Sequence, residues 1–443
     1  MSDVKMTITD PVYGAVPLSA LQADLIQTVE IQRLNSIHQL GMTFQVYPSA
    51  HSMRFSHALG VSHLAHRMGQ ELIQDNDRLP LSSSQREYQQ HILIAAGLLH
   101  DICHTPWSHT LEPLFIEVTG RDHMDMTHDL LCGNTVWPLK GAGRIPEILA
   151  DHGIRPQDVS RLIAKQYTDA HYLQQLIFGE VDADTLDYLC RDFTSTGVSF
   201  GHIDIDRLIR TMVVRPDRLY FQAKGLQAVR DFLNARVEMY SAVYFHKKTR
   251  IADCMCLRAA RCSVVERHEF PDFWLMTDDE FLSALMTQSG SDYVRDIAWR
   301  LKYRQDLFKR VYHIESGAVS SEQKRFLSAI GRMAIDPRVT ATRLEMLIAA
   351  KLDIPAGYVI VDHVAAAADV SESRFRELDI LFLDKDGSIR TLPEMDRPFD
   401  EYIRRAQPSR SLLSVYAPAT YRERCMDRLP DVFRQIVGES GVA

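Results

Sequence analysis

The sequence predicts a mainly α-helical protein that ends in a small α+β module. Through most of residues 1–313, apolar residues recur three or four positions apart, which is the spacing of one helix face. Most strand-like runs lie after residue 357, where β-branched and aromatic residues alternate with turn-forming ones. A small, polar stretch at 314–324 separates the two parts. We therefore expect a helical core over residues 1–313 and the α+β module over residues 314–443.

The first part contains four segments with a clear helical pattern, at residues 18–38, 55–68, 91–104 and 184–193. Pro106 follows the third segment and should stop it, because proline cannot donate the backbone hydrogen bond that a helix needs. A hairpin is expected at residues 212–221, where Pro216 and Asp217 suit a type I turn. A long helix should follow, from about residue 225 to 266.

The C-terminal part shows a mixed pattern. Helices are expected at residues 321–335 and 340–352. Strands are expected at residues 358–361, 378–383 and 412–416, with a hairpin turn at the DKDG stretch, 384–387.

Composition narrows the class of protein. The net charge of -8, from 58 acidic and 50 basic residues, argues against nucleic acid as the main partner but leaves room for a local basic pocket. The longest uncharged apolar run, residues 92–99, is too short to cross a membrane, and the N-terminus lacks the apolar core of a secretory signal. Seven scattered cysteines indicate reduced thiols. We expect a cytoplasmic protein without a membrane partner.

Histidine is the most informative residue type. Of the 18 histidines, eleven lie between His38 and His128. Imidazole binds transition metals and titrates near neutral pH, so this crowding predicts a metal or proton-transfer site.

A metal site has a specific candidate in the apolar segment LIAAGLLHDICH. His100 and Asp101 end this segment, and burying either group is costly unless it has a partner. Further ligands must come from elsewhere, and His57 and Asp184 lie in two other amphipathic segments. Two histidines and two carboxylates suit Mn, Fe, Co, Ni or Zn.

Each of these residues also has an ordinary interpretation. An isolated His-Asp pair is usually a capped or salt-bridged surface feature, and a histidine on an amphipathic helix such as His57 is usually structural. Asp184 could be a helix N-cap. The metal hypothesis depends on the whole ordered set.

That set occurs within seven ordered blocks that resemble one family. They are DPVYGAVPL (10–18), IQRLNSIHQLG (31–41), VYPSAHSMRFSHALGV (46–61), AAGLLHDICHTPWSH (95–109), THDLL (127–131), VDADTLDYLCRDFTSTGVSFG (181–201) and ARVEMYSAVYFHKKTR (235–250). Over about residues 8–270, the chain resembles the HD-domain deoxynucleoside triphosphate triphosphohydrolases. This family includes bacterial enzymes and the catalytic core of the animal sterile-alpha-motif and HD-domain restriction factor. The resemblance implies an HD-domain helical core.

The resemblance also implies roles for particular residues. The implied metal ligands are His57, His100, Asp101 and Asp184, with Mg as a further ion on the substrate phosphates. The implied catalytic residues are His104 and His128, supported by Glu112, together with His109 as the proton donor to the leaving 5′-oxygen. The implied substrate-binding residues are Gln39, Leu40, Arg54, Tyr188, Asp192, Arg236, Tyr244, His246 and Lys247.

The function implied is cleavage of a deoxynucleoside triphosphate (dNTP) to deoxynucleoside and triphosphate by a metal-dependent homo-oligomer, from dimer to tetramer or larger. Two alternatives stay open: an HD phosphohydrolase that acts on a monophosphate or modified nucleotide, and a nucleotide-sensing or single-strand-binding module without turnover. The family's guanine-reading Asp and Arg are replaced here by Gln27 and Asn35. We therefore expect no guanine-dependent activation.

Overall fold

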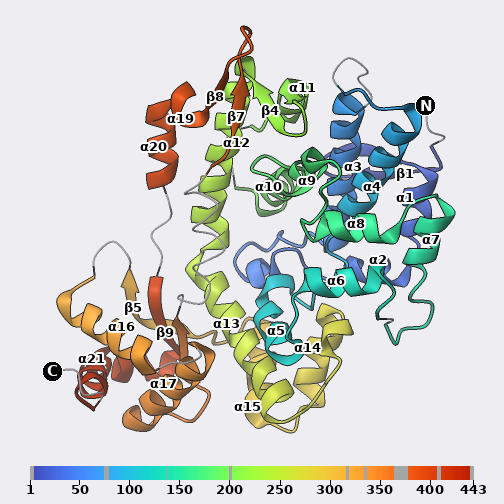
Figure 1. Cartoon of the computed structure of the whole chain (residues 1–443). Helices are drawn as coiled ribbons and strands as arrows, with labels where there is room; N and C mark the ends of the chain where they lie inside the picture. The colour runs from blue at the N-terminus through green and yellow to red at the C-terminus, as the bar shows by residue number, and fades with distance from the viewer. Residues whose placement is uncertain are drawn as a thin grey trace. The chain divides into compact units, whose positions relative to one another are not determined.

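The computed structural model describes residues 4–73, 79–135, 137–198, 202–315, 319–333, 337–363, 378–406 and 411–439. These residues form a mainly helical fold with small sheets, as predicted (Figure 1). They divide into two compact units that are not continuous in sequence. The first contains Met1–Tyr244, Asp272–Asp279 and Glu377–Ala406, and the second contains Phe245–Pro271, Glu280–Arg376 and Gln407–Ala443.

The helices of the first unit are α1 (Ala20–Leu25), α2 (Val29–Arg33), α3 (Arg54–Leu72), α4 (Ser83–Leu99), α5 (Glu112–Thr119), α6 (His123–Leu131), α7 (Ile145–Asp151), α8 (Pro156–Ile163), α9 (His171–Phe178), α10 (Ala183–Thr196), α11 (Ile205–Thr211), α12 (Leu226–Met239), α19 (Leu392–Met395) and α20 (Arg397–Arg405). Its strands are β1 (Met6–Asp10), β2 (Gly14–Leu18), β3 (Met212–Val214), β4 (Leu219–Gln222), β7 (Leu381–Leu383) and β8 (Ile389–Thr391). A π-helical turn, Tyr240–Tyr244, follows α12.

The core of the first unit is built on α3, with α4 and α10 packed beside it (Figure 1). The contact between α3 and α4 is close because Gly97 has no side chain: a Cβ there would lie 3.1 Å from the Cα of Ser62. The Ser62 hydroxyl donates to the Ile94 carbonyl across the same contact, at 2.9 Å. This packing fixes the end of α4, from which the site residues continue.

The second unit contains α13 (Lys247–Arg261), most of α14 (Asp278–Thr287), α15 (Asp292–Tyr303), α16 (Ser321–Met333), α17 (Pro337–Leu352) and α21 (Arg422–Glu439). Its sheet has the order β5–β9–β6, formed by Lys309–Glu315, Ser411–Ala417 and Ile360–His363, and both pairings are antiparallel. Phe326 of α16 stacks on Phe433 of α21 with ring centroids 4.1 Å apart, within the unit's hydrophobic core.

The two units do not meet at a single sequence boundary near residue 314. Strand β7 pairs in parallel with β4, where Phe221 is opposite Phe382, and this pairing places 378–406 with the first unit. Conversely, β5 begins before residue 314 and pairs with β9 in the second unit. The predicted boundary was based on local composition, which carries no information about pairing between distant strands.

Both predicted hairpins are confirmed. β3 and β4 pair antiparallel with Met212 opposite Phe221, and β7 and β8 pair antiparallel around the turn at 384–387. Gly387 has φ +86° in that turn, a left-handed conformation that favours glycine.

Three predicted helices are wrong in extent. The 18–38 segment breaks into the end of β2, the short helices α1 and α2, and a 3-10 turn. The predicted 91–104 helix ends at Leu99, and residues 100–103 form a turn. The long helix at 225–266 is interrupted by the π-helical turn at Tyr240–Tyr244.

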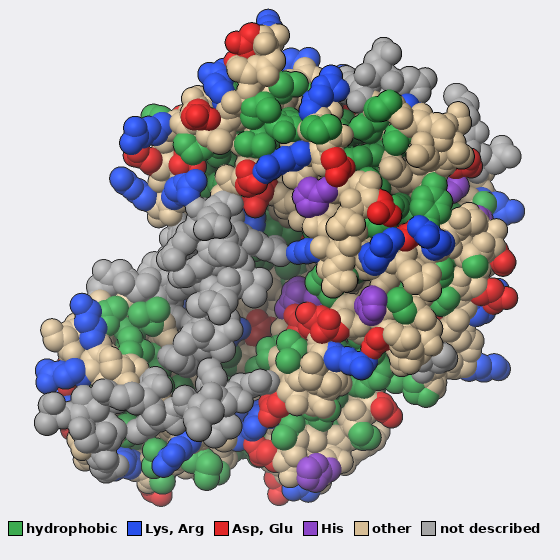
Figure 2. All heavy atoms as spheres, viewed as in Figure 1, with side chains coloured by type: hydrophobic (Ala, Val, Ile, Leu, Met, Phe, Trp, Pro, Cys, Tyr) green, Lys and Arg blue, Asp and Glu red, His purple; other side chains and the backbone are tan. Residues whose placement is uncertain are grey.

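Among the described residues, no helix is both long and apolar enough to cross a membrane. On the face drawn in Figure 2, Lys and Arg side chains are mixed with Asp and Glu side chains, with histidines between them. Such mixing on the described part of this face differs from the basic stripe that is typical of nucleic-acid-binding surfaces.

Candidate metal centre and active site

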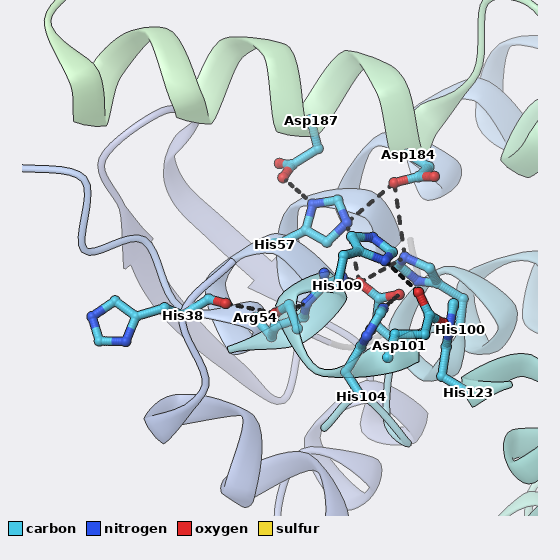
Figure 3. Close-up of polar contacts among 12 residues, drawn as sticks. His38, Arg54, His57, His100, Asp101, His104, His109, His123, Asp184 and Asp187 are labelled. Carbon is cyan, nitrogen blue, oxygen red and sulfur yellow. Dashed lines mark hydrogen bonds and ion pairs between the residues drawn. The ribbon is translucent and has the colours of Figure 1, made fainter. Parts of the chain in front are cut away.

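The four predicted metal ligands converge from three helices. His57 lies on α3, His100 and Asp101 directly follow α4, and Asp184 lies in the first turn of α10. The Nε2 atom of His57 is 3.2 Å from Asp184 Oδ1 and 3.5 Å from Asp101 Oδ2. The Nε2 atom of His100 is 3.3 Å from Asp101 Oδ2 and 3.9 Å from Asp184 Oδ1. Two imidazole nitrogens and two carboxylates therefore face one point (Figure 3).

Both imidazoles are oriented by hydrogen bonds at the opposite nitrogen. His57 Nδ1 contacts Asp187 Oδ2 at 2.8 Å, and His100 Nδ1 contacts the Gly97 carbonyl at 2.9 Å. His100 Nε2 is buried and makes no hydrogen bond with any described residue. A nitrogen in that state is suited to donate its lone pair to a cation.

The N-cap explanation for Asp184 does not hold. Asp182 is the N-cap of α10, and its Oδ1 accepts a hydrogen bond from the Thr185 backbone N–H at 2.7 Å. Asp184 follows two residues later, and its carboxylate faces His57 and His100 instead.

The electrostatics of the site fit a divalent cation. Burial alone would lower the pKa of His57, but the neighbouring Asp184 and Asp187 carboxylates raise it to about 10. Asp101 is also buried, and its pKa lies well below the usual range because Arg54 and the adjacent histidines outweigh the burial. The pKa of Asp184 is lowered as well, and two carboxylates that stay ionised beside two imidazoles form a donor set for Mn, Fe, Co, Ni or Zn. The residues present therefore fit the metal that the sequence predicted.

A second cluster adjoins the first. The ring of His104 stacks on that of His123, with centroids 3.9 Å apart. Glu112 accepts a hydrogen bond from His123 Nδ1 through one oxygen and contacts His109 Nδ1 at 2.7 Å through the other. His104 also approaches Asp101, with Nε2 3.2 Å from Oδ1. The two clusters are thus connected through Asp101.

The three central groups of this cluster have different protonation preferences. Burial, Arg54 and His123 hold the pKa of His104 well below its usual range. Burial would lower the pKa of His123, but Glu112 raises it. Burial would raise the pKa of Glu112, but hydrogen bonds from His109 and His123 lower it. A neutral His104 imidazole therefore lies against the ion pair of His123 and Glu112.

The segment that carries His104 is held by its surroundings rather than by a helix. Trp107 and Ser108 have φ values of 52° and 56°, which are unusual for residues with side chains. The Trp107 N–H donates to Asp278 Oδ1 at 2.6 Å, and Arg33 donates to the His104 carbonyl at 2.8 Å. These contacts fix a backbone that the local sequence does not favour.

Two of the buried cations of the first unit are predicted phosphate-binding residues. Arg54 donates to Asp101 and, at 2.8 Å, to Ser108 Oγ, while its Nη2 is buried and makes no hydrogen bond with the described residues. Arg236 lies on α12 with 2% of its surface exposed.

Two predicted sugar-binding residues, Tyr188 and Asp192, come together with Tyr244. Tyr188 and Asp192 lie one turn apart on α10, and the Tyr244 hydroxyl donates to Asp192 Oδ2 at 2.7 Å. Burial raises the pKa of Asp192 to about 7, although the Tyr244 hydrogen bond opposes the shift. The π-helical turn carries Tyr244 at its end, and such turns are frequent at functional sites. Gln39 and Leu40 directly precede the 3-10 turn Gly41–Gln45.

The comparisons with known proteins agree with this geometry. Residues 203–436 match the HD-associated region, and residues 54–177 match the HD domain. The chain belongs to the HD-domain phosphohydrolase family.

Three relatives illustrate the range of this HD-domain family. The uncharacterised protein YwfO of Bacillus subtilis is 38% identical over 55% of this chain and 52% of its own length. The uncharacterised protein MJ1154 of Methanocaldococcus jannaschii is 31% identical over 63% of this chain and 54% of its own length. The deoxynucleoside triphosphate triphosphohydrolase SAMHD1 of Homo sapiens is 26% identical over 57% of this chain and 44% of its own length. The matched region thus covers about half the length of these relatives.

Two solved structures share the fold over nearly the whole chain. A hypothetical protein from Aquifex aeolicus superimposes with a TM-score of 0.70 at 26% identity, covering 96% of this chain and 99% of that one. A phosphohydrolase from Bacteroides thetaiotaomicron superimposes with a TM-score of 0.68 at 24% identity, covering 94% and 100%.

The predicted catalytic role of His128 is corrected, because the structure does not bring this histidine to the catalytic cluster. Its Nδ1 contacts Ser160 Oγ at 2.6 Å, and the histidine stacked on His104 is His123. The two histidines are five positions apart on α6, which places them about 140° apart around the helix. Asp122 and Asp125 form a capping box, so the sequence did contain a signal that α6 starts at His123.

Three further predicted positions lie outside these clusters. His246 and Lys247 are at the start of α13, in the second unit, and their roles stay predictions. Gln27, at the predicted effector position, donates its side-chain amide to the Ala23 carbonyl at 2.9 Å.

Proposed function

We propose that this HD-domain hydrolase cleaves a dNTP at the α-phosphorus and releases deoxynucleoside and triphosphate. The observation that carries the proposal is the order of residues along α10. Asp184 faces the metal centre, and Tyr188 and Asp192 follow at intervals of four on one helix face. Eight residues of helix span about 12 Å, which leaves room for a metal-bound α-phosphate beside Asp184 and for the deoxyribose beside Asp192.

A divalent metal held by His57, His100, Asp101 and Asp184 would polarise a phosphate oxygen and make a bound water more acidic. The protein groups around it are arranged for proton movement. Neutral His104 accepts a proton from the attacking water, and the Asp101 carboxylate, whose Oδ1 is 3.2 Å from His104 Nε2, stabilises the imidazolium that results.

The bond changes follow from these positions. The water oxygen bonds to the α-phosphorus, and the bond from that phosphorus to the 5′-oxygen breaks. His109, whose ring centroid is 4.8 Å from that of His104, gives its proton to the departing 5′-oxygen. The triphosphate keeps all three phosphorus atoms.

Substrate charge and sugar are matched by separate groups. Arg54 Nη2 and Arg236 neutralise part of the triphosphate charge. Asp192 accepts a hydrogen bond from the 3′-hydroxyl, and Gln39 contacts the sugar. Leu40 offers no polar partner to a 2′-hydroxyl, which favours deoxyribose. Tyr244, which contacts Asp192, lines the nucleotide pocket.

The relatives named deoxynucleoside triphosphate triphosphohydrolase SAMHD1, from Bos taurus and Homo sapiens, support this substrate class. We also propose that the protein works as a homo-oligomer in the cytoplasm.

The test is a product analysis. The purified chain is incubated with each of the four dNTPs, four NTPs and four dNMPs in the presence of Mn, Mg, Co or Fe, and products are separated by chromatography. Deoxynucleoside and intact triphosphate in equal amounts are expected from dNTPs. Orthophosphate from dNMPs would instead identify a monophosphohydrolase, and nucleotide binding without any product would identify a sensing module.

A further inference from the structure

Asp187 is a buried carboxylate that none of the steps above uses. It lies on α10, three residues after Asp184, and its side chain is completely buried. Its Oδ2 is 2.8 Å from His57 Nδ1, on the side of the ring opposite the metal centre. In Figure 3, Asp184 and Asp187 flank the His57 ring from the same helix.

We propose that Asp187 is a positioning residue for the metal ligand His57. A carboxylate can only accept a hydrogen bond, so it holds the proton on Nδ1 and leaves the lone pair on Nε2, which faces Asp101 and Asp184. The negative charge also makes the imidazole a stronger donor to a cation. The inference depends on the metal centre and not on which nucleotide is cleaved.

Asp187 is itself held by Arg191, which lies one turn further along α10. Arg191 donates Nη2 to Asp187 Oδ1 at 2.8 Å and Nε to Oδ2 at 2.9 Å, a two-point contact that fixes the carboxylate plane. Arg191 donates its remaining nitrogen, Nη1, to Asp10 Oδ2 at 2.9 Å. Both charged partners are nearly completely buried, so the geometry is protected from water.

The series of contacts from His57 through Asp187 and Arg191 ends at Asp10, in the hairpin of β1 and β2. Asp10 Oδ1 accepts hydrogen bonds from the backbone N–H groups of Val12, at 2.8 Å, and Tyr13, at 3.1 Å. The turn of the N-terminal hairpin is therefore linked to a metal ligand through Asp10, Arg191 and Asp187.

Gly60 provides the space for this arrangement. It lies on α3 three residues after His57, and a Cβ there would be 1.8 Å from Asp187 Oδ1 and 2.5 Å from Arg191 Nη2. Alanine favours the helix more than glycine does, so Gly60→Ala would displace the ion pair without weakening the helix backbone. This variant perturbs the positioning while every charged group stays in the chain.

The experiment measures metal binding by the full-length, metal-stripped protein with Co²⁺ as the probe and no nucleotide present. Asp187→Asn and Gly60→Ala should each weaken Co²⁺ binding by about 10–100-fold and change its visible absorption spectrum. The matched control is Gly69→Ala on the same helix, where a Cβ would meet the end of the Gln90 side chain, 2.3 Å away. This control should bind Co²⁺ like the wild type.

Folding of each variant is checked by thermal unfolding of the metal-free protein. If Asp187→Asn does not fold, Gly60→Ala alone decides the question. Wild-type Co²⁺ affinity and spectrum in a folded Gly60→Ala or Asp187→Asn variant would overturn the proposal. Because no nucleotide is used, either result is independent of whether dNTPs are the substrate.

Discussion

The two neighbouring clusters of the site are built in different ways. In the metal cluster, His57 and Asp184 lie within helices, His100 and Asp101 directly follow one, and the His57 and His100 rings are each held by a hydrogen bond at Nδ1. In the catalytic cluster, His104 lies in a turn and His109 has a side chain that is 66% exposed. Local sequence is a good guide to the first kind of arrangement and a poor guide to the second.

The largest effect should come from removing a ligand of the metal cluster. Asp101→Ala deletes one anionic ligand and leaves Arg54 without its buried partner. We expect loss of bound metal and a fall in turnover of at least about 10⁴-fold, beyond what proton-transfer groups contribute. Metal analysis and rate measurement check this. If the variant keeps stoichiometric metal and normal turnover, Asp101 is not a metal ligand, and the division into a metal cluster and a catalytic cluster is wrong.

The catalytic cluster should be affected differently, in rate but not in metal content. His123→Ala should lower kcat by about 10²–10⁴-fold, as should His104→Ala, because each removes part of the proton-transfer set. His128→Ala is the matched control on the same helix and should stay near the wild-type rate. If His128→Ala lowers kcat more than His123→Ala does, the catalytic role that the sequence predicted for His128 is correct.

The turn that carries His104 can be loosened from outside the cluster. Asp278 accepts hydrogen bonds from the backbone N–H groups of Trp107, at 2.6 Å, and His38, at 2.8 Å. Asp278→Asn weakens charge-assisted hydrogen bonds worth about 1.5–3 kcal/mol, so kcat should fall roughly tenfold with metal content unchanged. Asp279→Asn, one residue further on, should have little effect. Equal rates for the two variants would show that the turn holds its shape by itself.

The proposed sugar-binding residue Asp192, near the end of α10, should make KM depend on pH. Burial raises the pKa of Asp192 to about 7, so its carboxyl is mostly protonated at pH 6 and mostly ionised at pH 8. An ionised carboxylate accepts the 3′-hydroxyl hydrogen bond more strongly, by about 1 kcal/mol, and KM should fall about fivefold over that range. A 3′-deoxy analogue and the Asp192→Asn variant should each lack this change. An identical pH profile for the analogue would exclude Asp192 from sugar binding.

The smallest effect is expected from guanine nucleotides. Gln27 and Asn35 lack the charges that would recognise guanine, and Gln27 already donates its amide to the Ala23 carbonyl. The initial rate on each non-guanine dNTP should therefore be unchanged by added GTP or dGTP. Activation of tenfold or more would show an effector site made of other residues.

The sequence by itself determined the helical class and both hairpins, and it predicted the candidate metal donor set. These features depend on short-range patterns, such as apolar spacing, turn residues and a His-Asp pair at the end of an apolar helix. His57, His100, Asp101 and Asp184 were predicted from the His-Asp pair and from the family resemblance of the ordered blocks. Each lies in or directly after a helix, where position in the sequence fixes direction in space.

Only the tertiary structure decided which histidine joins His104. The predicted helix over 91–104 ends at Leu99, so helical spacing no longer relates His104 to His100. The path from there through Trp107 and Ser108 depends on hydrogen bonds from Arg33 and to Asp278, which lie 71 and 171 positions away from their partners. The same reason applies to residues 378–406, which pack with the first unit because β7 pairs with β4. Contacts between distant segments determine these features, and no local pattern encodes them.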